Sequence, residues 1–238
     1  MLIHILDWLE MLARWLHIVV GAAWIGASFY FNWLNNSLRH YERTPNDVAG
    51  ELWAVHGGGF YQVSKYKLSP DRMSGPLHWF KWEAYFTWIS GVFLLVLVYY
   101  LGADGLLLKA DSGLSREMGV AIGVLTLAGG WLIYHTLCNS PLKHRPTTLT
   151  ALIFAGTIGV AYMLAQTLSD RAAFIHVGAM LGTCMAANVF FVIIPGQRAM
   201  VDALSAGETP DAEKGKAGAL RSLHNNYFTL PVLFVMIS

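Results

Sequence analysis

Charged residues are missing from six long stretches of this chain of 238 residues. A helix needs about 20 apolar residues to cross a hydrocarbon core about 30 Å thick, and the charge-free stretches are close to that length. Charged residues make up 13% of the chain, whereas a soluble domain has roughly 25%. We therefore predict an all-α fold, a polytopic transmembrane helix bundle that forms a single domain. Its six spans are expected in residues 15–38, 84–103, 118–142, 146–169, 172–197 and 222–238.

Cysteines, signal-peptide features and internal repeats are also scarce or missing. The two cysteines, Cys138 and Cys184, fall within different apolar stretches, so we expect reduced packing residues and no disulfide. Residues 1–13 contain Asp7 and Glu10 and lack both a basic segment and an A-x-A site, which argues against a cleaved signal peptide. Without a clear internal repeat, a transporter built of inverted halves is not favoured.

The basic residues are unevenly divided between the two sides of the predicted bundle. Twelve of the 16 Lys and Arg lie in or next to the first, third and fifth loops. The positive-inside rule then places the N-terminus outside and the long first loop, residues 39–77, in the cytoplasm. The twelve are Arg39, Arg43, Lys65, Lys67, Arg72, Lys81, Lys143, Arg145, Arg198, Lys214, Lys216 and Arg221.

Histidines lie at or just inside the ends of several predicted spans. His17 and His176 fall at the outer ends of the first and fifth spans, whereas His78, His135 and His224 form a second layer at the cytoplasmic ends. Two layers of imidazoles on neighbouring helices are typical of a b-type cytochrome, in which each haem iron takes one imidazole from either face. We predict the outer pair as candidate haem ligands and the inner three as weaker metal candidates. The alternative is that all five are interfacial or helix-bonding histidines.

A single carboxylate, Glu83, is expected one turn into the second span, among aromatic residues. It is two residues from Lys81, so the two side chains do not share a helix face and need separate partners. A carboxyl in aromatic surroundings can accept and hold a proton, which makes Glu83 a candidate general base. The alternative is a charge at the level of the lipid headgroups.

The first loop is predicted to fold as a cap. Glycines at 57–59 permit close approach of the backbone to a ligand, and they are flanked by His56, Gln62, Lys65 and several aromatic residues. Such a loop can hold a flat polar heterocycle by stacking and by hydrogen bonds. The glycines lack the spacing of a phosphate-binding P-loop, so nucleotide binding is not implied. A plain tight turn accounts for them equally well.

Three segments resemble a known family: residues 56–66, LHWFKWEAYFTWISG at 77–91, and LHNNYFTLPVLFVMIS at 223–238. They are similar to the N-terminal membrane domain of the bacterial cytochrome c-linked urate oxidases, or urate hydroxylases, and the resemblance covers essentially the whole chain. It implies an eight-helix domain in the bacterial inner (plasma) membrane, followed by a C-terminal cytochrome c. The last helices and a Cys-x-x-Cys-His haem attachment site are absent from this sequence. The resemblance therefore implies haem c in a fused or separate cytochrome c partner.

The resemblance also implies a substrate, urate, which is oxidised to 5-hydroxyisourate with water as the source of oxygen. The residue roles rest on chemistry alone. Trp79 would stack on the purine, and Gln62 or Lys65 would bind its oxygens. Glu83 or His56 would activate water for attack at C5. No nucleic acid partner is expected.

The sequence is compatible with two other classes of function besides urate oxidation. Under the resemblance, two electrons would move outward to the cytochrome c, by way of a haem b between His17 and His176. One alternative is a haem-binding, electron-transfer membrane subunit of a respiratory complex that does not act on urate. Another is a purine or small-solute permease. Absorbance from bound haem separates both redox functions from the permease, and urate-dependent reduction of cytochrome c separates them from each other.

Overall fold

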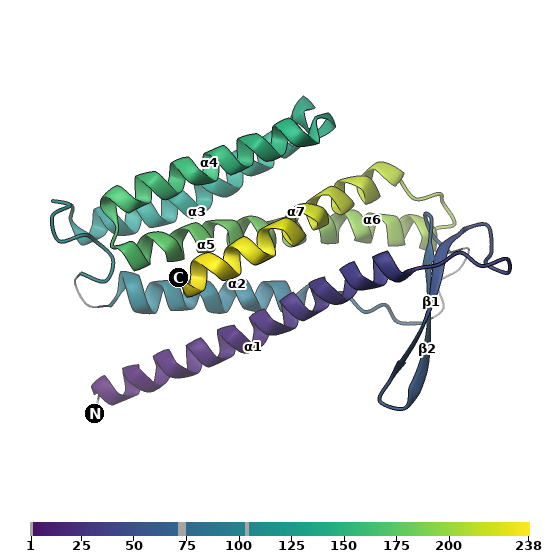
Figure 1. Cartoon of the computed structure of the whole chain (residues 1–238), viewed down its shortest axis with the longest axis horizontal. Helices are drawn as coiled ribbons and strands as arrows, with labels where there is room; N and C mark the ends of the chain where they lie inside the picture. The colour runs from purple at the N-terminus through teal and green to yellow at the C-terminus, as the bar shows by residue number, and fades with distance from the viewer. Residues whose placement is uncertain (1, 71–74, 103–104) are drawn as a thin grey trace.

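Helices dominate the computed structural model, which describes residues 2–70, 75–102 and 105–238 (Figure 1). A π-helical turn, η1 (Val96–Tyr100), follows α2, and a second one, η3 (Val189–Ile193), connects α5 to α6 without a break. A short 3-10 turn, η2 (Pro141–His144), connects α3 to α4. The α-helices are α1 (Leu2–Ser37), α2 (Trp82–Leu95), α3 (Arg116–Asn139), α4 (Pro146–Thr167), α5 (Asp170–Asn188), α6 (Ile194–Ser205) and α7 (Ala212–Ile237).

Five helical segments among the described residues are long and apolar enough to cross a membrane, so the prediction of a multi-pass membrane helix bundle is confirmed. They are α1, α2 with η1, α3, α4, and the continuous helix that runs from α5 to α6. The sixth predicted span, residues 222–238, falls almost entirely in α7, which is not one of these five segments, so the count of six spans is not borne out among the described residues. α1 has 36 residues, so it is about 54 Å long and extends beyond a hydrocarbon core about 30 Å thick.

α1, the continuous helix of α5 and α6, and α7 extend well beyond the charge-free stretches. α1 includes Glu10 and Arg14, which lie one turn apart and form an ion pair with each other. The fifth connection is only residues 206–211. Arg198 lies on α6, and Lys214, Lys216 and Arg221 lie on α7. The assignment of these four basic residues to a loop, from charge alone, is therefore wrong. A charged side chain does not end a helix when a partner or water satisfies it.

α5 is the central helix, with α2, α3, α4 and α7 packed around it (Figure 1). Glycines make this close packing possible: Gly130 on α3 leaves room for Met180, and Gly178 on α5 leaves room for Met236 of α7. The apolar core along α5 is formed by Leu107, Leu164, Leu168, Ala172, Ala173, Val177, Met180 and Leu181. The two cysteines are buried and free, as predicted.

The first loop folds as a two-stranded antiparallel hairpin, β1 (Val48–His56) and β2 (Gly59–Tyr66). Gly57 and Gly58 form its turn with φ angles of 57° and 78°, in the left-handed region that glycine adopts without strain. The consecutive glycines are thus a tight turn. The hairpin is joined to the end of α1 by a backbone bridge between Arg39 and Glu51, and its tip points away from the helices (Figure 1). Residues 71–74 of the predicted cap lie outside the described residues.

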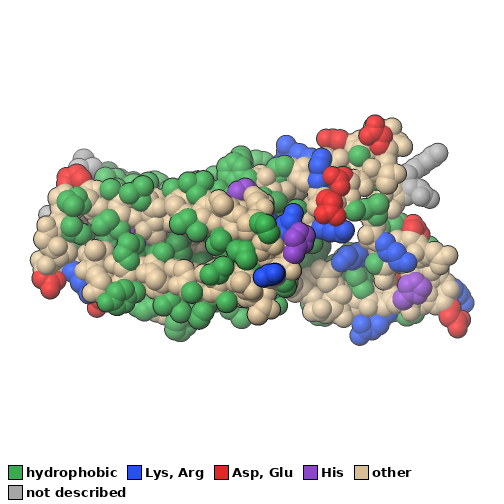
Figure 2. Space-filling model, turned by 90° about the horizontal axis from the view of Figure 1, so that it is seen from above, with side chains coloured by type: hydrophobic (Ala, Val, Ile, Leu, Met, Phe, Trp, Pro, Cys, Tyr) green, Lys and Arg blue, Asp and Glu red, His purple; other side chains and the backbone are tan. Residues whose placement is uncertain are grey.

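The two ends of the bundle differ in charge. Both chain termini lie at the end opposite the hairpin (Figure 1). On the face shown in Figure 2, most Lys and Arg side chains gather near the hairpin end. The uneven distribution of basic residues along the sequence thus corresponds to one end of the bundle. The location of that end in the cytoplasm follows from the positive-inside rule and stays a prediction.

Candidate functional site

Polar side chains from α3, α5 and α7 meet in the interior of the bundle and form what we call the Arg221 cluster. Its members are buried, with exposed fractions of 9% or less. Polar groups at membrane depth are costly, so a function is the first hypothesis for such a group. The cluster consists of Tyr134 and Cys138 on α3, Asn188 on α5, and Arg221, His224 and Asn225 on α7.

Arg221 is the centre of the cluster and is only 2% exposed. Its guanidinium donates to Asn188 Oδ1 at 3.3 Å, to Asn139 Oδ1 at 3.3 Å and to the His135 carbonyl at 3.5 Å. Its Cζ lies 5.0 Å from the centre of the Tyr134 ring. All of these partners are neutral, and within the described ranges no carboxylate forms an ion pair with Arg221. A buried cation with only neutral partners is costly, which suggests that its charge has a use.

Tyr134 and two asparagines connect the three helices. The Tyr134 hydroxyl lies 2.8 Å from Nδ1 of His224. Asn188 Nδ2 donates to Tyr134 Oη and to Asn225 Oδ1, both at 2.9 Å. Asn225 Nδ2 in turn donates to the carbonyl of Met185 at 3.1 Å. A phenol hydrogen-bonded to an imidazole can pass a proton, so the cluster offers a fixed positive charge together with a group that can exchange protons.

A second polar group lies around His176, which is fully buried on α5. Its Nε2 is 3.1 Å from the Tyr100 hydroxyl, and its Nδ1 is 2.7 Å from the Ala172 carbonyl. The ring packs against Gly123 of α3, where an added Cβ would lie 2.6 Å from Nε2. Both ring nitrogens therefore have protein partners.

His17 has different neighbours from His176. Its Nδ1 lies 2.9 Å from Ser90 Oγ on α2, and its ring packs against Gly91. No hydrogen bond or ring contact joins His17 to His176, although the structure describes both. As they are arranged here, the two imidazoles do not present an open pair of ring nitrogens to a haem iron. The pairing stays a prediction.

The three inner histidines do not gather into one cluster among the described residues, and their role as metal ligands stays a prediction. His135 and His224 belong to the surroundings of Arg221, whereas His78 is exposed and packs its ring 4.5 Å from that of Phe80. Nowhere in residues 2–70, 75–102 and 105–238 do three or more His, Cys, Asp or Glu side chains gather in a way that could hold a metal ion.

Glu83 lies in the first turn of α2, as predicted. Its Oε2 is buried and has no hydrogen-bond partner. The following residue, Ala84, packs in a small core with Val189 and Ile194, and the half-buried Trp79 lies against the same core. Trp79 and Ala84, the residue after Glu83, therefore lie in one region next to the junction of α5 and α6, and the unpartnered carboxylate oxygen of Glu83 makes it a candidate base.

The other predicted substrate ligands lie on the hairpin, apart from this region. His56 and Gln62 are exposed near the hairpin tip, which points away from the helices (Figure 1). Lys65 is exposed at the other end of β2 and donates to Asn35 Oδ1 of α1 at 2.7 Å. No described contact brings these three side chains together with Glu83.

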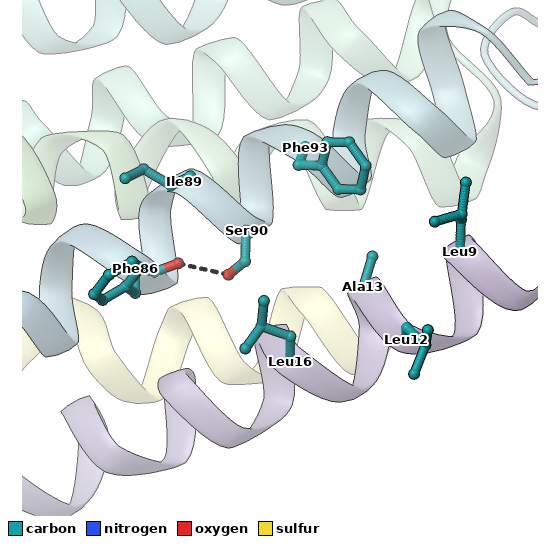
Figure 3. Close-up of a pocket in the computed structure, with 8 residues that line it drawn as sticks. All are labelled: Leu9, Leu12, Ala13, Leu16, Phe86, Ile89, Ser90 and Phe93. Atoms are coloured by element: carbon teal, nitrogen blue, oxygen red, sulfur yellow. Dashed lines mark hydrogen bonds between the residues drawn. The ribbon is translucent and has the colours of Figure 1, made fainter.

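An apolar cleft of ≈ 280 Å³ opens between the N-terminal half of α1 and α2 (Figure 3). Ser90 points into it from α2, and its Oγ already donates to the carbonyl of Phe86 at 2.7 Å. The cleft offers almost no polar surface to a purine, so it suits a lipid chain better than a heterocycle. Its lining residues are Leu9, Leu12, Ala13, Leu16, Phe86, Ile89, Ser90 and Phe93.

Sequence reasoning missed the role of four residues of the Arg221 cluster. Arg221 was counted only among the basic residues in or next to the fifth loop, and Tyr134, Asn188 and Asn225 were given no part in a site. A signal was present, because Asn188 stands within a long apolar stretch. In addition, Arg221 and Asn225 are four residues apart on one helix, so they share a face.

Comparison with known proteins identifies the family. The family model described as "Urate oxidase N-terminal" matches residues 3–238, so the chain belongs to the urate oxidase N-terminal family. No curated protein and no solved structure matches it. The matched range includes both Glu83 and the Arg221 cluster, so both candidate regions lie within the family domain.

Proposed function

We propose that this membrane domain oxidises urate to 5-hydroxyisourate and that the electrons pass to a cytochrome c. Membership of the urate oxidase N-terminal family supports urate as the substrate. The observation that carries the proposal is the buried and unpartnered Oε2 of Glu83. It lies in the segment 77–91, among aromatic side chains that suit a planar substrate.

The reaction needs water and an electron acceptor. Counted with substrate and product in the same charge state, urate and one water give 5-hydroxyisourate, two protons and two electrons. A bond forms between C5 of urate and the water oxygen, and the water loses a proton as that bond forms. Glu83 accepts this proton, and the second proton leaves the purine ring for solvent. A cytochrome c, fused or separate, is reduced by one electron at a time, so two equivalents are consumed per urate.

The protein's own residues supply position and proton transfer in this scheme. Trp79, half-buried in the region of Glu83, gives an aromatic face on which the purine can stack. His56, Gln62 and Lys65 are on the hairpin, outside this region. We give them no part in the chemical step and propose them as contacts for urate on its way from the aqueous side.

The test is urate-dependent reduction of cytochrome c by the protein together with its cytochrome domain or partner. We expect urate to be consumed with two cytochrome equivalents reduced and no hydrogen peroxide formed. Glu83→Gln should lower kcat much more than it changes urate binding, because a proton acceptor is needed mainly in the transition state. Glu208→Gln, an exposed carboxylate between α6 and α7, is the matched control and should leave turnover unchanged.

Two outcomes would contradict the proposal. Stoichiometric peroxide would mean that oxygen, and not a cytochrome, takes the electrons. Reduction of cytochrome c that does not depend on urate would instead indicate an electron-transfer subunit without urate activity.

A further inference from the structure

The charge of Arg221 has no counter-charge in the described part of the chain. Its three hydrogen bonds, at 3.3, 3.3 and 3.5 Å, are all longer than the usual distance of about 2.9–3.0 Å. A guanidinium has five N–H groups in a planar fork that matches planar anions. The side chain is therefore held in place by weak neutral contacts, while its charge and part of its donor capacity are left for another group.

One face of α3 next to Arg221 carries side chains suited to a planar heterocycle. Trp131, His135 and Asn139 are spaced four residues apart, so they lie on one face of the helix, which we call the α3 stripe. The rings of Trp131 and His135 are 4.8 Å apart. Nδ1 of His135 is buried and has no hydrogen-bond partner. Arg221 donates hydrogen bonds to two residues of the stripe, to the carbonyl of His135 and to Oδ1 of Asn139.

The stripe also gives a path from solvent. Asn139 is exposed at the end of α3, on the side of η2, whereas Arg221 is 2% exposed. An anion that enters past Asn139 can replace the long bonds of the guanidinium with shorter, charge-assisted ones. It would meet the ring of Trp131, which is stacked against Phe191, and an unpartnered ring nitrogen at His135.

We propose that Arg221 and the α3 stripe form a binding site for a planar organic anion, and that this anion is urate, which carries one negative charge at neutral pH. The identity of the anion rests on the proposed function, whereas the anion site rests on Arg221 itself. Asn188, which accepts from Arg221, directly precedes Val189, which packs with Ala84 beside Glu83. Arg221 and Ala84, the residue after Glu83, thus contact two consecutive residues of the central helix, Asn188 and Val189.

The experiment measures urate binding to the full protein in detergent by equilibrium dialysis, together with thermal unfolding with and without urate. Arg221→Gln should weaken urate binding roughly 10- to 100-fold, because a charge-assisted pair is lost. It should also abolish the stabilisation by urate. Lys214→Gln is the matched control, since it removes a positive charge from an exposed position of the same helix and should leave binding unchanged.

A second variant keeps the inference testable if Arg221→Gln does not fold. Asn139→Asp has almost the same shape and places a carboxylate where the amide oxygen lies 3.3 Å from the guanidinium. This internal counter-charge should raise the unfolding temperature without urate and weaken urate binding at least about 10-fold. Asn139→Asp that binds urate as tightly as the unchanged protein would overturn the inference, and so would Arg221→Gln that keeps the stabilisation by urate.

Cytochrome reduction separates this inference from the proposed function. If urate drives reduction but Arg221→Gln has an unchanged KM, the anion site is wrong and the proposed function stands. If urate binds through Arg221 but drives no reduction of cytochrome c, the site stands and the proposed function is wrong.

Discussion

The Tyr134 hydroxyl lies 2.8 Å from Nδ1 of His224, and this contact joins α3 to α7 across the interior of the bundle. The same hydroxyl accepts from Asn188 of α5. One oxygen atom thus serves three helices at a depth where water is scarce. An interaction of this kind fixes how the helices sit relative to one another, because each polar group would be costly without its partner.

Tyr134→Phe should destabilise the protein by about 1–3 kcal/mol, because His224 and Asn188 each lose a hydrogen bond in a buried site. Thermal unfolding in detergent, followed by circular dichroism, measures the change. Tyr162→Phe on α4 is the control, because Tyr162 is 70% exposed and its hydroxyl is not part of the cluster. If both variants unfold at the same temperature, the Tyr134 hydroxyl does not hold the helices together.

Gly123→Ala should also destabilise the protein, by about 1–3 kcal/mol, through overpacking. The added methyl group would clash with the Tyr100 hydroxyl and lie 2.6 Å from Nε2 of His176. Gly129→Ala on the same helix is the matched control, because nothing lies within 4 Å of the position of its Cβ. Gly129→Ala should be neutral or slightly stabilising, since alanine favours the helix. Equal losses for the two variants would mean that the contact with His176 is not tight.

A reporter inserted after Asn46, in the loop before the hairpin, should behave as cytoplasmic. The physical reason is the concentration of Lys and Arg at that end of the bundle. A second insertion, after Ser112 in the connection between η1 and α3, should report the opposite side. A periplasmic signal from the first insertion would reverse the orientation, and with it the side from which urate reaches Asn139.

The fold follows closely from the sequence, because lipid removes most alternatives. Backbone groups in a bilayer must be satisfied within the chain, so apolar stretches near 20 residues become helices. The boundaries were less predictable. Arg14 lies inside α1, where it pairs with Glu10, and Arg221 lies inside α7, where neutral groups of α3 and α5 surround it. Glu10 can be found four residues before Arg14 in the sequence, whereas the neutral partners of Arg221 are not visible when charges are counted along the chain.

The candidate site was predicted in part. The first-turn location of Glu83 on α2 is confirmed, whereas its role stays a prediction. The contacts of Arg221 could not be predicted, because Asn139 and Asn188 reach it from two other helices, and a sequence does not say which helices are neighbours. The hairpin was predicted only as a folded cap, whose glycines were explained equally well by a ligand-binding loop or by a tight turn. Its strands do alternate in side-chain direction, but its exposed tip depends on how it is joined to α1.

The π turn η3 is equivalent to one extra residue inserted into an otherwise regular helix. A single residue corresponds to about 100° of rotation around the helix axis. Asn188, just before the turn, points to α7, whereas Ile194, just after it, packs against α2. Deleting one residue from 189–193 would restore a uniform helix and swing everything beyond it away from α2. The number of residues in η3 thus sets the angle around the helix axis between the side chains that face the Arg221 cluster and those that pack against α2 beside Glu83.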